Sequence, residues 1–107
     1  MTAVNATRNA PRLVVAESIT SGAAPVVGPY DIDISGPDFV SQQPYGGGGD
    51  DVHQLAADAG LNVITFTVPG SNVWVEMWID PDTEHITRET IIDPGHRIEH
   101  TISYSTS

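Results

Sequence analysis

Three of the four histidines lie near the C-terminus, where imidazole groups could bind a metal ion. They are His85, His96 and His100. On an extended strand, four residues separate the Cβ atoms of His96 and His100 by ~13 Å, too far for one ion that needs ligands at about 2.0–2.1 Å. A shared site would need His85 or His53 to come close to one of them. Otherwise His100, which lies between two isoleucines, is a core or interface histidine with one hydrogen-bonding partner.

Acidic residues alternate through one expected turn, as they do at the start of a calcium-binding loop. They are Asp80, Asp82 and Glu84. Such a loop needs glycine at its sixth position and glutamate at its twelfth, where this chain has His85 and Ile91. A solvated turn is the simpler interpretation, and we expect no cofactor. The weak candidates for metal ligands are His85, His96, His100, Asp80 and Asp82.

An aromatic face is the more interesting feature of the same region. Trp74, Glu76 and Trp78 share one side of an expected strand at residues 72–80. If this side is covered, the tryptophans belong to the core, which is the first interpretation. If it is exposed, two aromatic rings beside a carboxylate suit a partner protein or a sugar ring.

Signatures of catalysis are missing from the sequence. The chain has no cysteine and no G-x-S-x-G nucleophile motif. The run Gly46–Gly49 leads into Asp50 and Asp51 rather than into the Gly-Lys-Ser/Thr of a phosphate-binding loop. Carboxylate pairs are expected by chance on so acidic a surface. We therefore predict that the protein is not an enzyme.

The charge balance is strongly acidic. The chain contains fourteen aspartates and glutamates but only four arginines and no lysine, so the formal net charge is −10. Nucleic acids and anionic membranes are poor partners for such a surface, because both bind lysine and arginine. The composition resembles that of proteins from salt-loving archaea and their viruses, where a Debye length of roughly 3 Å at 1 M salt screens the repulsion. An ordinary acidic bacterial protein is the alternative.

Alternating apolar and polar residues predict an all-β fold. The pattern recurs in residues 12–20, 26–35, 62–68, 72–80, 85–92 and 96–105, with turn residues between the runs. About seven short strands of this kind are typical of a small antiparallel β-sandwich, immunoglobulin-like or jelly-roll-like. No long helical period competes with the strands, so a parallel α/β sheet is not expected.

The segment before residue 62 allows two interpretations. Around residues 51–59 an aspartate cap, a face of Val52 and Leu55, and a stop at Gly60 favour a short helix. The alternative is a strand that leads into residues 62–68. Residues 36–49 are expected to form a long loop, either functional or disordered, with a flexible glycine run.

One domain is expected over residues 12–107, preceded by a flexible or docking arm at residues 1–11. Arg8 and Arg12 supply half of the positive charge, so an arm of this kind could bind an acidic neighbouring copy. The N-terminus lacks the apolar run of a signal peptide, and no segment has the ~20 apolar residues of a membrane helix.

These observations favour a non-enzymatic structural or interaction module. We expect it to assemble with itself, as a homo-oligomer, or to dock on a larger shell. A virion decoration protein or an extracellular, cell-surface component of a halophilic archaeon or its virus would fit. The alternative is a small β-sandwich that binds carbohydrate or metal. The residues expected at the interface are Arg8, Arg12, Phe39, Tyr45, Trp74 and Trp78.

Overall fold

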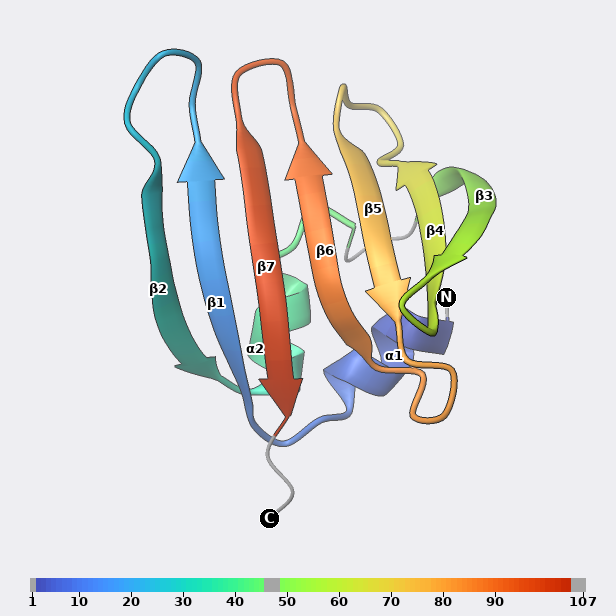
Figure 1. Ribbon diagram of the computed structural model, residues 1–107. Coiled ribbons are helices and arrows are strands. Elements are labelled where there is room, and N and C mark those ends of the chain that lie inside the picture. The colour runs from blue at the N-terminus through green and yellow to red at the C-terminus, as the bar shows by residue number, and fades with distance from the viewer. Residues whose placement is uncertain (1, 46–48, 105–107) are drawn as a thin grey trace.

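Seven antiparallel strands in one sheet form the framework of the protein (Figure 1). The computed structural model describes residues 2–45 and 49–104. The strands are β1 (Leu13–Thr20), β2 (Val27–Ile34), β3 (Asp50–Asp58), β4 (Leu61–Thr67), β5 (Trp74–Ile79), β6 (Ile86–Ile92) and β7 (Arg97–Tyr104). Their order across the sheet is β2-β1-β7-β6-β5-β4-β3. The expected all-β class with about seven antiparallel strands is confirmed.

The second layer consists of two short helices, α1 (Thr2–Arg8) and α2 (Gly36–Ser41), where the sequence suggested a second sheet. Both helices lie behind the same face of the sheet (Figure 1). Apolar residues of that face and of the helices form the core, because alternate residues of each strand point toward the helices. The strands contribute Leu13, Val15, Phe66, Val75, Met77, Ile86, Ile91 and Ile102, and the helices contribute Ala3, Val4, Phe39 and Val40.

Helix α1 corrects the expectation of an arm at residues 1–11. The Thr7 side chain is fully buried, and its Oγ1 atom lies 3.2 Å from the Tyr104 hydroxyl and 3.1 Å from the Ile86 amide, which donates to it. The Tyr104 hydroxyl in turn donates to the Ile86 carbonyl oxygen at 2.5 Å. Burial raises the pKa of Tyr104 to about 12, so this link persists across the physiological range. The start of the chain is therefore part of the domain.

Helix α2 occupies the first part of the expected long loop. Ser35 caps it by accepting a hydrogen bond from the Asp38 amide at 3.2 Å. The Gly36 amide donates to the Ala10 carbonyl oxygen at 2.9 Å, which joins the two helical segments. The expected flexible glycines at residues 46–48 lie outside the described residues.

The segment Asp50–Asp58 is the edge strand β3, so the helix interpretation was wrong and the strand alternative correct. The pairing of β3 with β4 shifts between Asp50 and His53 and again between Leu55 and Asp58. Asp51 and Ala59 adopt positive φ angles at these irregular ends. A helix of nine residues is marginal by itself, whereas the strand gains backbone hydrogen bonds from β4.

No helix in residues 2–45 and 49–104 is both long and apolar enough to cross a membrane.

Candidate functional site

A row of polar side chains crosses the helix-covered face of the sheet. The register places Tyr30 opposite Glu17, Glu17 opposite His100, and His100 opposite Glu89, on strands β2, β1, β7 and β6. All four side chains therefore point to the same side of the sheet, with His100 and Glu89 buried and Tyr30 exposed at the edge. The sequence pattern alone does not connect these four residues, because strand register is not a local property.

His100 is the centre of this row. Its Nε2 atom lies 2.8 Å from Glu17 Oε1, and its Nδ1 atom lies 2.7 Å from Glu89 Oε1. The Tyr45 hydroxyl donates to the second oxygen of Glu89 at 2.5 Å, and the Tyr30 hydroxyl donates to Glu17. His100, Glu89 and Tyr45 are buried, whereas Glu17 connects the row to the surface. The prediction of a core histidine is confirmed, with two partners instead of one.

The environment of the row shifts several pKa values. Burial alone would lower the pKa of His100, but hydrogen bonds and charges from Glu89 and Glu17 outweigh it and raise the pKa. Burial would raise the pKa of Glu17, but hydrogen bonds from Tyr30 and His100 lower it. Burial and the adjacent Glu89 carboxylate raise the pKa of Tyr45 well above its ordinary value. These contacts favour the protonated form of His100, which lies between the Glu17 and Glu89 side chains.

The position of this row makes it an internal ion pair. The Phe39 ring of α2 contacts the His100 ring edge-on, with 5.7 Å between centroids. Tyr45 and Phe39 are both buried over the row. Contact with a dissolved substrate is therefore blocked at His100, and the row holds strands β1, β7 and β6 together.

The other metal candidates are held apart. The His85 ring stacks on Tyr104 at 4.1 Å between centroids, and His96 Nδ1 lies 3.2 Å from Asp93 Oδ1. Asp80 caps its own turn by accepting a hydrogen bond from the Asp82 amide at 2.8 Å. Across residues 2–45 and 49–104, no group of three histidine, cysteine or acidic side chains could hold a metal ion.

Trp74 and Trp78 have different environments, although they share the face of the sheet opposite the helices, here called the helix-free face. Trp78 is only 9% exposed. Its indole nitrogen donates to Asp58 Oδ2 at 2.9 Å, and the Arg88 guanidinium lies 4.5 Å from the ring centroid. Trp74 is 55% exposed. The core interpretation therefore applies to Trp78, and Trp74 is exposed enough to contact a partner.

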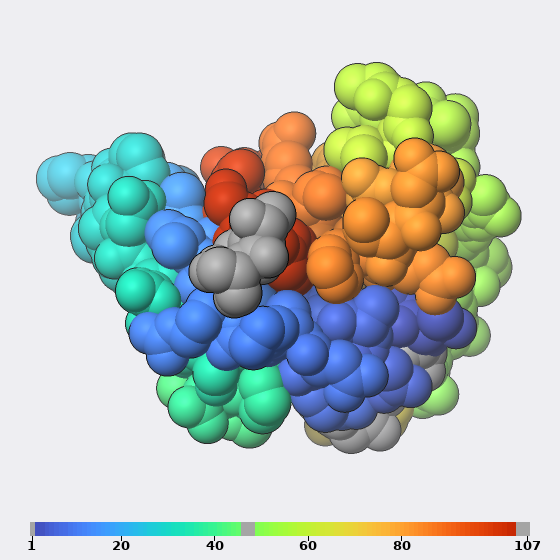
Figure 2. Space-filling model, turned by 90° about the horizontal axis from the view of Figure 1, so that it is seen from below, coloured from blue at the N-terminus to red at the C-terminus, as the bar shows by residue number. Residues whose placement is uncertain are grey.

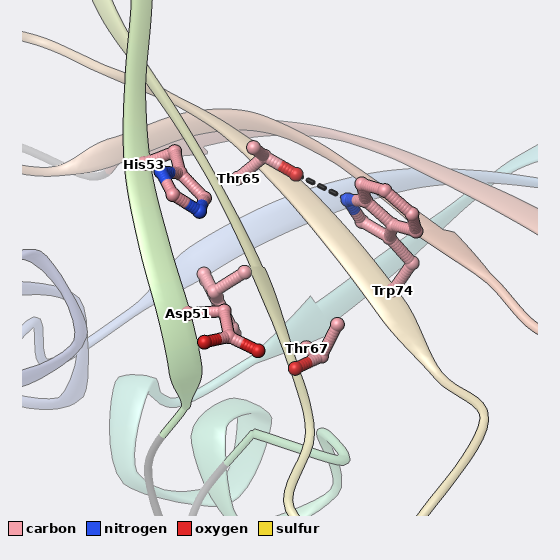
Figure 3. A pocket seen from close by; sticks show the side chains of 6 residues that line it. Asp51, His53, Thr65, Thr67 and Trp74 are labelled. Atoms are coloured by element: carbon pink, nitrogen blue, oxygen red, sulfur yellow. Dashed lines mark hydrogen bonds between the residues drawn. The ribbon is translucent and has the colours of Figure 1, made fainter.

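Two hollows meet at Trp74 on the helix-free face. One has a volume of about 400 Å³ and is lined by Leu55, Thr65, Trp74, Glu76 and Ile92. The other has a volume of about 320 Å³ and adds polar groups beside the ring (Figure 3); it is lined by Asp51, His53, Thr65, Phe66, Thr67 and Trp74.

The Trp74 ring is held in place between the hollows. Its indole nitrogen donates to Thr65 Oγ1, as the dashed line in Figure 3 shows. The Thr65 hydroxyl donates to the Val75 carbonyl oxygen at 3.0 Å. A fixed, half-exposed aromatic ring loses little conformational entropy when it contacts a ligand. Trp74 is the residue around which we place the candidate binding site.

The remaining expected interface residues lie elsewhere. Phe39 and Tyr45 are buried in the core, which corrects their assignment to partner contacts. Arg8 donates to Asn5 Oδ1 at 2.6 Å, and Arg12 forms an ion pair with Asp33 at 2.8 Å. Both arginines are occupied within the chain.

The sequence analysis missed residues on both sites. Glu89 was not singled out, and only the register shows that it meets His100. Leu55 was assigned to a helix face, and Ile92 was not singled out. Both line the hollow beside Trp74. The alternation of apolar and polar residues around Leu55 in β3 and Ile92 in β6 was the sequence signal that could have placed both on this face.

Comparisons with known proteins give one informative likeness. No protein-family model matches the sequence, and no curated protein matches it. Among solved structures, the lipoprotein LppX of Mycobacterium tuberculosis superposes with a TM-score of 0.61. The two sequences are 14% identical, and the match covers 99% of this chain and 92% of that one. This likeness concerns the fold alone.

Fluorescence quenching should separate the two tryptophans. In Trp78→Phe, the remaining Trp74 is half exposed, so acrylamide should quench its emission strongly. In Trp74→Phe, the remaining Trp78 is covered by Asp58 and Arg88, so its emission should be protected severalfold. Acrylamide is suitable because it is neutral and is not repelled by a net charge of −10. Equal quenching in both variants would contradict this description.

The stability of the protein should depend on pH through the buried row. His100 has a raised pKa, so its contribution to the free energy of unfolding is complete below pH 6.5, the ordinary histidine pKa. This contribution is lost as pH rises through the raised pKa. Glu17 has a lowered pKa, so its contribution to the free energy of unfolding is complete above pH 4.5, the ordinary glutamate pKa. This contribution is lost as pH falls through the lowered pKa. Urea unfolding should therefore show maximal stability between these limits. Above them, stability should decline at up to about 1.4 kcal/mol per pH unit.

Two variants and a direct titration test this assignment. His100→Gln leaves the buried Glu89 carboxylate without its cation and should cost about 3–5 kcal/mol. Glu17→Gln removes only the partly exposed charge, so the protein should fold, and the decline above pH 6.5 should be smaller and end at a lower pH. NMR titration of the His100 ring measures the pKa directly. A wild-type His100 that titrates below 6.5 would overturn the assignment.

Proposed function

We propose that this chain is a non-enzymatic interaction module that binds a partner protein through its helix-free face. The supporting observation is the fixed, half-exposed Trp74 ring with exposed apolar neighbours. Leu55 is 42% exposed and Ile92 is 40% exposed, and both line the same hollow as Trp74. Figure 2 shows that the helices lie on one side of the molecule, while the opposite side is depressed between its two edges.

The energetics of association favour Trp74 as the centre of such an interface. Tryptophan is enriched among the few residues that dominate binding energy, especially where neighbours exclude water around it. Leu55 and Ile92 flank the ring from strands β3 and β6 and would form this surround. Loss of a central tryptophan commonly weakens binding by 2 kcal/mol or more, on the order of 30-fold.

Assembly with further copies, or docking on a larger shell, is part of this proposal. Each copy has a net charge of −10, so copies repel one another at low salt. Molar salt reduces the Debye length to roughly 3 Å and strengthens apolar contacts relative to this repulsion. A halophilic, virion or cell-surface setting is proposed on the same grounds of charge and composition.

Sedimentation velocity at low and molar salt tests the self-assembly. The wild-type protein should sediment as a larger species in molar salt, and Trp74→Ser or Leu55→Ser should weaken association at least tenfold. Val26→Ser is the matched control, because Val26 is 59% exposed but lies before β2, outside the Trp74 hollows. A wild-type protein that stays monomeric at every salt concentration would count against self-assembly.

A carbohydrate site is the second candidate, favoured by the polar groups in the smaller hollow. Asp51, His53 and Thr67 surround one side of the Trp74 ring (Figure 3). An aromatic face with adjacent hydrogen-bonding groups suits a sugar ring. A glycan array should then give hits that Trp74→Ala and Asp51→Asn both abolish while circular dichroism stays unchanged. An array with no such hits would remove this candidate.

A further inference from the structure

We propose that the partner segment bound at Trp74 is cationic and amphipathic. By this we mean a segment of another protein that places apolar side chains on Trp74, Leu55 and Ile92 and directs lysine or arginine toward Glu76 and Asp51. This inference rests on the proposed function, because it names the chemistry of the partner for the same surface.

The positions of the two carboxylates are the first step. Glu76 lines the apolar hollow with Leu55 and Ile92, and Asp51 lines the second hollow, which shares Trp74 and Thr65 with the first. In the described part of the chain, neither carboxylate lies within ion-pair distance of an arginine or histidine. Each hollow at Trp74 therefore contains a negative charge that a partner can neutralise.

None of the four arginines reaches these carboxylates. The chain contains four arginines and no lysine. Arg12 pairs with Asp33 and Arg97 with Glu99, whereas Arg8 donates to Asn5 and Arg88 lies over Trp78. A partner that supplies lysine or arginine complements this surface, whereas an anionic membrane or nucleic acid does not.

Two other occupants fit this surface less well. A second copy would bring its own Glu76, Asp51 and net charge of −10 against the first, which disfavours self-docking unless salt is high. A strand added to the edge of β3 would need a regular row of backbone groups. The pairing of β3 shifts between Asp50 and His53 and between Leu55 and Asp58, so the edge is irregular. The binding mode that fits this surface is therefore one in which side chains of the partner enter the hollow at Trp74.

A synthetic amphipathic peptide of leucine and lysine, without aromatic residues, is the probe. Its binding to the full chain is measured by fluorescence anisotropy of a label on the peptide at moderate salt. Two matched peptides serve as controls, one with glutamate in place of lysine and one with serine in place of leucine. The leucine–lysine peptide should bind at least tenfold more tightly than either control.

Variants of the protein test the location. Trp74→Ala should weaken binding by about 30-fold. Glu76→Gln should weaken it by about two- to fivefold and should reduce its salt dependence, since one charge contact is lost. Val26→Ser should bind like the wild type, because Val26 is exposed outside the hollows.

Three outcomes would overturn the inference. If the glutamate peptide binds as tightly as the lysine peptide, the hollow selects for apolar side chains without regard to charge. If the serine–lysine peptide binds as tightly and Trp74→Ala has no effect, the peptide only follows the net charge. If no peptide binds while the wild-type protein assembles in a Trp74-dependent way, the proposed function stands and the cationic partner is rejected.

Discussion

A histidine held between two carboxylates inside the sheet is the interaction on which the rest of the structure depends. Glu17, His100 and Glu89 come from three adjacent strands, and Glu17 is 83 residues away from His100 in the sequence. A shift of either pairing by one residue would turn a charged group out of the row and bury its neighbour instead. Because an unpaired buried charge costs several kcal/mol, the row selects this register over its alternatives.

The covered and the open face of the sheet follow from that arrangement. Phe39 of helix α2 and Tyr45 cover the buried part of the row at His100 and Glu89. In residues 2–45 and 49–104 no helix covers the other face, where Trp78 is shielded by Asp58 and Arg88 and Trp74 is left half exposed. With its few cations engaged internally, the protein presents an open face that combines apolar side chains with unneutralised carboxylates.

Local patterning explains how much of the fold could be predicted. Six expected strands agree with the observed ones to within two residues at each end, the largest difference being residue 72 against Trp74 at the start of β5. Period-two alternation is a local property, so it survives in any tertiary context. The segment 51–59 was misjudged because its apolar spacing also fits one helix face. Pairing with β4, which no local pattern contains, made it a strand.

The residue pattern alone established the all-β class, six of the seven strands and the acidic charge balance, and it left His100 as a core or interface histidine. The three-dimensional contacts supplied the rest. They make Glu17 and Glu89 the partners of His100 and cover them with Phe39 and Tyr45. They also leave Trp74 half exposed while Trp78 is buried. The physical reason is that alternation assigns a residue to a face, whereas register and the covering of each face arise from contacts between distant segments. Residue types mark what a site can contain, and packing decides which of those groups meet.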